Sequence, residues 1–278
     1  MFFTTAVALR SRCLFMNDGP MQIANSVVAV TGGASGLGAG VIRKAVESGA
    51  RAAVVLDVNE AAAESLINEL GERTHFLSCD VTSSEQIARA IEQIIDSFGT
   101  LDIAVACAGV GLGQRTLSRD GTPANIDDFR RVLDINLVGT FDFARQAASA
   151  MHRNAADDPA QENGVIVMTS SSAAYEGQIG QVAYSASKGG VVSMTTPLAR
   201  DLASARIRVV TVAPGLIDTP IYAQLGDEVK ERLQGLAVFP QRFGAPAEFA
   251  HLVQALVENT YMNGEVVRLH GATHLPPR

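Results

Sequence analysis

Tryptophan is absent from this sequence of 278 residues, cysteine occurs only three times, and lysine also only three times among 22 basic residues. Three scattered cysteines are too few for a disulfide framework or a zinc site, so we expect plain thiols in a reducing compartment and no bound metal. No apolar run approaches the roughly 20 residues that a helix needs to cross a bilayer. No stretch is dense in Lys and Arg, and the formal net charge is -7. These absences argue against nucleic acid and membrane partners and favour a small-molecule substrate.

The first 22 residues differ from the rest of the chain. They carry Arg10 and Arg12 and no acid before Asp18, which faintly resembles a mitochondrial transit peptide. The basic residues follow the apolar stretch, so the segment is not typical of a secretory signal. An over-long start is the alternative, because Met16 and Met21 both lie just ahead of the first expected strand. We predict that residues 1–22 are an extension, disordered or upstream of the true start. The expected location is the cytoplasm, or the mitochondrial matrix if the extension is a transit peptide.

Residues 23–278 alternate short β-branched runs with helical patterns, and no linker, repeat or low-complexity tract divides them. Seven runs are typical of strands, at residues 26–30, 53–57, 75–79, 103–107, 165–169, 207–212 and 265–269. Alternating strands and helices favour right-handed crossovers, which place helices on both faces of a parallel sheet. We therefore predict one α/β domain, a doubly wound Rossmann-type sandwich with a seven-stranded parallel sheet.

Two helices and three irregular stretches can be placed by pattern. A capping box is predicted at residues 82–85, ahead of a helix whose apolar face carries Ile87, Ile91, Ile94, Ile95 and Phe98. A second helix is predicted from Pro246, with a buried stripe of Phe249, Val253, Leu256 and Val257. Polar stretches at 111–125 and 157–164 indicate loops. The stretch at 218–244 is long enough to form a lid over a site at the carboxyl ends of the strands.

A glycine-rich turn at residues 31–38 follows the first strand and leads into a helix. Gly32, Gly36 and Gly38 permit a tight turn and a close approach of the backbone to a pyrophosphate, which the helix N-terminus then faces. The second strand ends at Asp57, where an acid would bind the ribose hydroxyls and repel the 2′-phosphate of NADP. Because residues 58–60 bring no cation, the sequence predicts NAD as the cofactor. The alternative for Asp57 is a turn residue at the end of a strand.

Tyr184 and Lys188 are four residues apart at the start of an apolar helix, so they lie one turn apart on the same face. A phenol is a poor acid–base catalyst at neutral pH until a nearby cation stabilises the phenolate. Lys188 can supply that field, and lysine is rare in this chain. We interpret the pair as a general acid–base and its cation, with a solvated helix face as the alternative.

These motifs resemble those of the short-chain dehydrogenase/reductase family. Residues 31–38 are similar to its Thr-Gly-x-x-x-Gly-x-Gly signature, Tyr184 and Lys188 to its Tyr-x-x-x-Lys, and Pro214 with Gly215 to its Pro-Gly on the nicotinamide side. The likeness runs from about residue 26 to the end of the chain. It is strongest to members that act on 3-hydroxyacyl-CoA, through residues 176–178, 183–190, 199–202, 213–216, 246–257 and 263–266.

The resemblance implies roles for further residues. Ser171, 13 residues before Tyr184, would hold the substrate oxygen, Asn136 would hold a water in the proton relay, and Lys188 would lower the pKa of Tyr184 and bind the nicotinamide ribose. It also implies that the cofactor contacts are Gly32, Ser35, Gly36, Leu37, Gly38, Asp57, Asp80, Val81, Cys107, Ala108, Gly109, Tyr184, Lys188, Pro214, Gly215, Ile217 and Thr219.

Two departures from the family pattern fall near the expected site. Residues 106–109 read Ala-Cys-Ala-Gly where many members have Asn-Asn-Ala-Gly, so hydrogen bonding at the end of the fourth strand is expected to be weaker at Ala106. His270 replaces an acid, and the tail after it ends differently. These changes bear on subunit contacts and the edge of the pocket, and leave the hydride chemistry in place.

The expected function is that of an NAD-dependent oxidoreductase that interconverts a secondary alcohol and a ketone. The favoured pair is (S)-3-hydroxyacyl-CoA and 3-oxoacyl-CoA, in fatty acid metabolism, and the family implies a homotetramer. Alternatives are a 3-oxoacyl-carrier-protein reductase, whose usual preference for NADPH conflicts with Asp57, and a steroid or xenobiotic alcohol dehydrogenase. An alternative of another class is a catalytically idle NAD-binding scaffold subunit, which would not need Asn136, Ser171, Tyr184 and Lys188 together.

Overall fold

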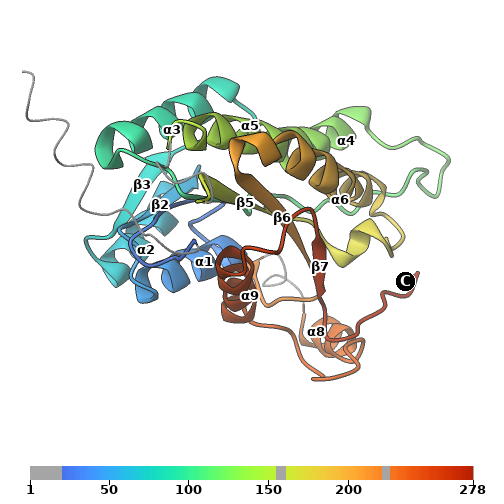
Figure 1. The fold of residues 1–278 in the computed structure, drawn as a ribbon. Helices are drawn as coiled ribbons and strands as arrows, with labels where there is room; N and C mark the ends of the chain where they lie inside the picture. The colour runs from blue at the N-terminus through green and yellow to red at the C-terminus, as the bar shows by residue number, and fades with distance from the viewer. Residues whose placement is uncertain (1–20, 155–160, 221–225, 278) are drawn as a thin grey trace, which may run out of the picture.

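The computed structural model describes residues 21–154, 161–220 and 226–277. The predicted extension, apart from residues 21 and 22, and the first half of the predicted loop at 157–164 lie outside these residues. Seven parallel strands form one sheet in the order β3-β2-β1-β4-β5-β6-β7 (Figure 1). Their bounds are Val27–Thr31, Ala52–Asp57, Thr74–Ser78, Ile103–Ala106, Gly164–Thr169, Ile207–Pro214 and Val266–Leu269 for β1 to β7. The order reverses between β1 and β4, where open parallel sheets bind their ligands. The predicted doubly wound sandwich is confirmed.

Helices cover both faces of the sheet because successive strand residues point to opposite sides. Val27 and Ala29 pack with the helices of one layer, which are α3 (Ser84–Phe98), α5 (Gly139–Met151) and α6 (Val182–Asp201). Val28 and Val30 pack with the other layer, which holds α1 (Gly36–Glu47), α2 (Glu60–Leu70) and α9 (Pro246–Glu258). The central strands β1, β4, β5 and β6 are therefore buried on both sides, as in most parallel sheets, and the edge strands β3 and β7 are partly exposed. The predicted stripe of α9 is confirmed, since Phe249, Val253, Leu256 and Val257 are all buried.

Local signals located the start of α3 one residue too early. Ser83, not Thr82, is the N-cap, and its hydroxyl accepts a hydrogen bond from the amide of Gln86. The Gln86 side chain in turn accepts from the amide of Asp80. The predicted capping box at 82–85 is therefore wrong by one residue, because the Thr82 hydroxyl donates to the Asp80 carboxylate and Ser83 caps the helix instead.

The segment predicted as a lid at 218–244 contains a helix, α8 (Asp227–Gln234), which the polar sequence did not indicate. A hydrogen bond joins the two ends of the 218–244 segment, in which the amide of Asp218 donates to the carbonyl of Gly244 at 2.8 Å. The predicted loop at 111–125 is irregular, and α4 (Ile126–Leu133) follows it. None of the described helices is long and apolar enough to cross a membrane.

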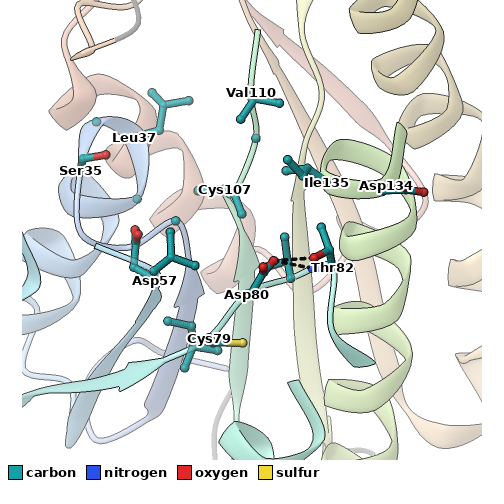
Figure 2. A pocket seen from close by; sticks show the side chains of 18 of the residues that line it. Ser35, Leu37, Asp57, Cys79, Asp80, Thr82, Cys107, Val110, Asp134 and Ile135 are labelled. Atoms are coloured by element: carbon teal, nitrogen blue, oxygen red, sulfur yellow. Dashed lines mark hydrogen bonds between the residues drawn. The ribbon is translucent and has the colours of Figure 1, made fainter. Parts of the chain in front are cut away.

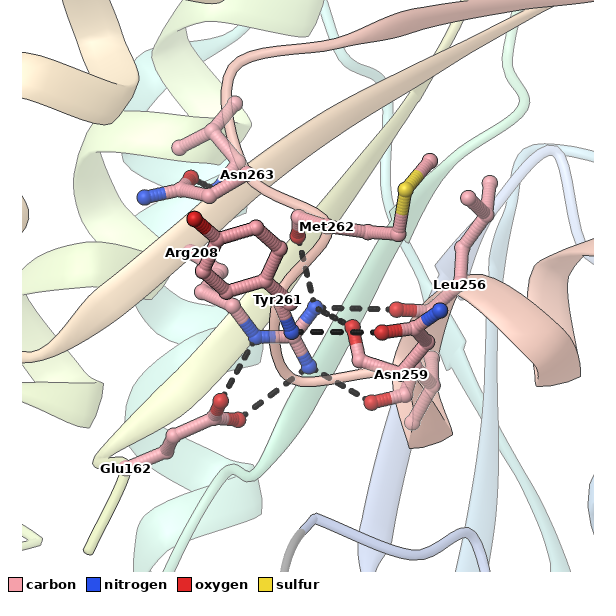
Figure 3. Close-up of polar contacts among 9 residues, drawn as sticks. Glu162, Arg208, Leu256, Asn259, Tyr261, Met262 and Asn263 are labelled. Carbon is pink, nitrogen blue, oxygen red and sulfur yellow. Dashed lines mark hydrogen bonds and ion pairs between the residues drawn. The ribbon is translucent and has the colours of Figure 1, made fainter. Parts of the chain in front are cut away.

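A buried arginine at the start of β6 fastens the far end of α9 (Figure 3). Arg208, only 5% exposed, pairs with Glu162 through Nε at 2.7 Å and through Nη2 at 3.1 Å. Its Nη1 and Nη2 also donate to the carbonyls of Leu256, Val257, Asn259 and Met262. A helix leaves its last carbonyls without partners, and a cation there also suits the helix dipole.

Candidate active site

A cavity of about 860 Å³ lies at the carboxyl ends of β1, β2 and β4, where the strand order reverses. Figure 2 shows Ser35, Leu37 and Asp57 on one side of it and Asp80 with Thr82 on another. Twelve of the predicted cofactor contacts line this cavity: Gly32, Ser35, Gly36, Leu37, Gly38, Asp57, Asp80, Val81, Cys107, Ala108, Gly109 and Thr219. Pro214, Gly215, Ile217 and the four predicted catalytic residues do not line it.

The glycine-rich turn packs against its neighbours more closely than a side chain would permit. Gly32 has a φ of +64°, and a Cβ there would come within 2.8 Å of the Ala108 backbone. A Cβ on Gly38 would overlap the carbonyl of Gly32, so the helix and the turn could not pack together. Helix α1 begins at Gly36 after Ser35, whose side chain makes no capping bond, and its first turn carries no acid. Its free amides and positive dipole end therefore fit a pyrophosphate.

Asp57 ends β2 with its carboxylate held in place. Its two oxygens accept hydrogen bonds from the amides of Ala34 and Asn59, each at 3.0 Å. Asp80 at the neighbouring strand end is fixed in a similar way by the amide and hydroxyl of Thr82. An oriented acid at the end of the second strand fits a ribose diol.

Two arginines that the sequence reasoning missed also line the cavity. Arg130 and Arg131 lie on α4, and Arg130 pairs with Asp127 at 3.0 Å. Residues 58–60, which follow Asp57 in the sequence, carry no cation, and α4 reaches the cavity through tertiary structure. No local signal could have identified these two residues.

The loop after β4 connects the cavity to the predicted catalytic residues. A Cβ on Gly109 would lie 3.3 Å from Oδ1 of Asn136 and 3.5 Å from Nζ of Lys188. Cys107 Sγ accepts a hydrogen bond from the Thr169 hydroxyl at 3.6 Å, and burial raises the pKa of its thiol to about 11. Cys107 is thus a neutral thiol packed between the two halves of the site. The backbone pairing with β1 continues past Ala106, since the amide of Cys107 donates to the carbonyl of Thr31, while Ala106 itself offers no side-chain hydrogen bond.

Tyr184 and Ser171 are joined by a hydrogen bond between their side chains. Burial raises the pKa of the Tyr184 phenol above its ordinary value, and the bond to Ser171 opposes that shift. Ser171 also accepts from the amide of Ala173 at 3.1 Å, which fixes its hydroxyl at the start of a short 3-10 turn. Ser170 points elsewhere and donates to the carbonyl of Lys188 at 2.8 Å. The Ser171 hydroxyl therefore faces Tyr184, and that of Ser170 is turned away from it.

Lys188 is 4% exposed and donates from Nζ to the carbonyl of Thr169 at 2.8 Å. Nζ lies 5.9 Å from the centroid of the Tyr184 ring, on the same helix face, as the spacing predicted. Burial lowers the pKa of Lys188 to about 8, while the pKa of Tyr184 is raised. The shift of the Tyr184 pKa is caused by burial and by Ser171, and an effect of Lys188 on the tyrosine pKa stays a prediction.

Asn136 is fully buried in a π-helical turn, Asp134–Val138, between α4 and α5. Its side-chain amide bonds both backbone groups of Val110 and donates to Ser187 Oγ at 3.1 Å. A π turn often marks a functional site. The same element packs against α6, which carries Tyr184 and Lys188.

The segment after β6 closes the other end of the site. Gly215 packs against His270, since a Cβ on Gly215 would lie 2.7 Å from Cβ of His270. Ile217 is buried and pairs with Gly244. Thr219 and Pro220 approach Gly36 of the glycine-rich turn. His270 therefore stands at the edge of the site, as its departure from the family pattern suggested. Within the described part of the chain, no group of side chains is arranged to hold a metal ion.

Comparisons with known proteins agree with this arrangement. The family model of short chain dehydrogenases matches residues 26–230. The chain is 47% identical to 3-hydroxyacyl-CoA dehydrogenase type-2 of Homo sapiens over 252 residues, which cover 90% of this chain and 96% of that protein. The crystal structure of 3-hydroxyacyl-CoA dehydrogenase type-2 from Mycobacterium avium superposes with a TM-score of 0.86 at 41% identity, covering 91% and 98% of the two chains. A 3-ketoacyl-(acyl-carrier-protein) reductase from Brucella melitensis complexed with NADH gives 0.80 at 25% identity, covering 91% and 100%.

Proposed function

Because this chain belongs to the short-chain dehydrogenase family and is an oxidoreductase that works with a nicotinamide coenzyme, we propose that it interconverts a short-chain (S)-3-hydroxyacyl-CoA and the 3-oxoacyl-CoA. The observation that carries the substrate is the 47% identity to human 3-hydroxyacyl-CoA dehydrogenase type-2 over 90% of the chain. A carrier-protein reductase is less favoured, since the solved example is 25% identical. A place in fatty acid metabolism is part of this proposal.

In the proposed mechanism Tyr184 removes the proton of the substrate hydroxyl during oxidation and returns it during reduction. Ser171, already bonded to Tyr184, holds the substrate oxygen beside the phenol. The nicotinamide ring, when bound, supplies the carbon that accepts or returns the hydride. Lys188 holds the nicotinamide ribose and favours the phenolate, and Asn136 holds the water of the proton relay. A scaffold without activity would not need these four side chains in one buried cluster.

We propose NAD over NADP as the coenzyme. The support is Asp57, whose carboxylate is fixed by two backbone amides at the end of β2 and would repel a 2′-phosphate. Arg130 and Arg131 line the same cavity, and their positive charge acts against this repulsion. We expect kcat/KM to be much higher with NAD, and Asp57→Ala to narrow the gap. Equal values for the two coenzymes in the unmutated protein would contradict this proposal.

The substrate is tested by kcat/KM on acetoacetyl-CoA with NADH, compared with acetoacetate and a 17-ketosteroid. We expect the CoA ester to react best, because the acyl chain occupies an apolar cleft beneath the 218–244 segment while the CoA body adds binding outside it. Leu236, Val238 and Phe239 of that segment are candidates for its wall, and Leu225 lies outside the described residues. A steroid turned over at least about tenfold more efficiently would overturn the substrate and leave the reaction type standing.

We also propose a homotetramer in a reducing compartment, the cytoplasm or the mitochondrial matrix. Exposed apolar side chains support assembly: Ile126, Val138 and Phe141 lie along α4, the π turn and α5, and Tyr261, 98% exposed, follows α9. Cys79 and Cys107 are free thiols, which suits a reducing compartment. Imaging of a C-terminal fusion to a fluorescent protein would test the location.

A further inference from the structure

The last described residues run against the segment that leads to the catalytic helix. We call residues 271–277 the C-terminal strap. The side chain of Gln178 donates to the carbonyl of Pro276 at 3.1 Å, and the amide of Ile179 donates to the carbonyl of Pro277 at 3.0 Å. In Figure 1 the red end of the chain passes between α8 and the yellow segment before α6.

Glu176 gathers three partners that all belong to β7 or the strap. Its carboxylate accepts from Nη2 of Arg268 at 3.0 Å and contacts Nδ1 of His274 at 2.9 Å. It also accepts from the amide of Leu275 at 3.0 Å. The Arg268 guanidinium lies 5.0 Å from the Tyr175 ring centroid, which adds a cation–π contact beside the carboxylate. A carboxylate with one guanidinium, one imidazole and one amide is a strong local anchor.

The anchored segment is continuous with Ser171 and Tyr184. The amide of Glu176 donates to the carbonyl of Ser172, so the anchor stands directly after the 3-10 turn that Ser171 caps. Gly177 packs against the side chain of Ser185, because a Cβ there would overlap its hydroxyl. The strap is therefore fastened to the segment that lies between the two predicted catalytic hydroxyls.

The other end of the strap is fastened to the 218–244 segment. The amides of Val238 and Phe239 both donate to the carbonyl of Gly271, at 3.0 and 3.3 Å. His270, just before the strap, packs against Gly215 at the end of β6. The strap thus spans from the predicted lid to the catalytic segment across the carboxyl ends of β6 and β7.

We propose that Glu176 is a positioning residue that anchors the C-terminal strap, and that the anchored strap closes the acyl end of the substrate site and limits the acyl chain length. The inference rests on the proposed function for the identity of the substrate. Neither Glu176 nor the strap takes part in the proton or hydride steps.

The chain-length test uses NADH with acetoacetyl-CoA and 3-oxododecanoyl-CoA. Glu176→Gln keeps the size of the side chain and removes the charge that holds Arg268. We expect the ratio of kcat/KM for the long ester to that for the short ester to rise roughly tenfold, while kcat on acetoacetyl-CoA stays within about twofold. The matched control is Glu69→Gln, which removes a carboxylate paired with Arg43 at the surface of α2. An unchanged ratio, or an equal loss of kcat on both esters, overturns the proposal.

Hydrogen exchange provides a readout that needs no substrate. In Glu176→Gln the amides of Leu275 and Ile179 should exchange roughly tenfold faster than in the unmutated protein and in Glu69→Gln. Unchanged exchange overturns the anchor, and faster exchange without a change in chain-length ratio overturns the role in specificity. If the unmutated protein does not reduce acetoacetyl-CoA, the proposed function fails instead, and the exchange result still decides whether Glu176 anchors the strap.

Discussion

At the scale of single residues, the two buried groups on α6 titrate in an order set by desolvation. The Lys188 ammonium loses its proton near pH 8, while burial holds the Tyr184 phenol protonated beyond its ordinary range. Burial disfavours the charged form of each group, so it lowers the pKa of the base and raises that of the acid. The protein alone therefore keeps Tyr184 as a phenol at neutral pH, with the hydroxyl of Ser171 as its partner.

Replacing Tyr184 by Phe should lower kcat by roughly 10²–10⁴-fold, the usual contribution of general acid–base catalysis, with NADH still bound. The variant keeps the ring and removes only the hydroxyl that bonds Ser171. Steady-state kinetics and NADH fluorescence measure the two effects. Tyr175→Phe is the matched control, because that half-exposed ring lies under Arg268. Near-normal kcat in Tyr184→Phe would assign the proton transfer to another residue.

The two neighbouring serines should differ in what their loss affects. Ser171→Ala removes the partner of Tyr184 and should lower kcat by roughly 10²-fold, the order seen when one donor to a reacting oxygen is removed. Ser170→Ala breaks a buried bond to the Lys188 carbonyl and should lower the free energy of unfolding by about 1 kcal/mol, with a smaller effect on kcat. Kinetics and urea unfolding on both variants test this. A larger loss of kcat in Ser170→Ala would mean that the wrong serine is assigned.

Coenzyme affinity should depend on pH through Lys188. Below pH 8 the ammonium is present, and above pH 8 it is lost, so the Kd for NADH should rise as the pH is raised through about 8. Lys188→Arg keeps its charge across this range and should flatten the curve, whereas Lys44→Arg should leave it unchanged. Fluorescence titration of NADH at a series of pH values measures the effect. A Kd for NADH that does not change with pH would show that the charge of Lys188 does not contribute to coenzyme binding.

The relative positions of site residues could be predicted from the sequence where they depend only on local helix geometry. The placement of Tyr184 and Lys188 on one face follows from their four-residue spacing and helix periodicity. Arg130 and Arg131 could not be found in this way, because only packing brings α4 to the cavity. The desolvation of Lys188 could not be predicted from the sequence either, because the spacing of residues along the chain does not show how deeply a side chain is buried.

At the scale of elements, the strands and most helices were predictable because they are buried on fixed faces. Two-sided burial explains why β1 reads as a continuous apolar run, and the 3.6-residue period identified α9. Helix α8 was missed because it carries little apolar content in its eight residues. The π turn at Asn136 was missed as well, since an extra residue in a helix leaves no pattern in composition.

Arg208 should stabilise the fold more than the exposed ion pair between Arg43 and Glu69 does. Arg208→Met removes the partner of Glu162 and of four carbonyls at the end of α9, so we expect a loss of about 3–5 kcal/mol in the free energy of unfolding. Arg43→Met, which breaks the exposed pair with Glu69, should lose only about 0–1 kcal/mol. Urea unfolding of both variants gives the comparison. Equal losses of unfolding free energy in the two variants would contradict the expectation that the buried contacts of Arg208 stabilise the fold more than an exposed ion pair.

At the scale of the whole molecule, exposed apolar side chains follow helices of both layers. Val138 is 54% exposed just before α5 of one layer, and Tyr261 follows α9 of the other. A tetramer built from two different interfaces needs both, so Val138→Glu and Tyr261→Glu should each give a dimer. Native mass spectrometry measures the outcome. If both variants remain tetrameric, the subunit contacts do not lie at these two residues. If the unmutated protein is a monomer, the proposed tetramer is wrong.

The position of β7 at the far edge of the sheet has a consequence during synthesis. The ribosome releases the N-terminal half first, so β1, β2 and the glycine-rich turn can assemble while the end of the chain is still in the exit tunnel. β7 pairs only with β6, and the strap follows it, so both join last. A nascent or prematurely terminated chain would then hold a dinucleotide cleft while the side that faces the acyl group stays open. If the strap limits the acyl chain length as proposed, that selection would begin only after residues 271–277 have left the ribosome.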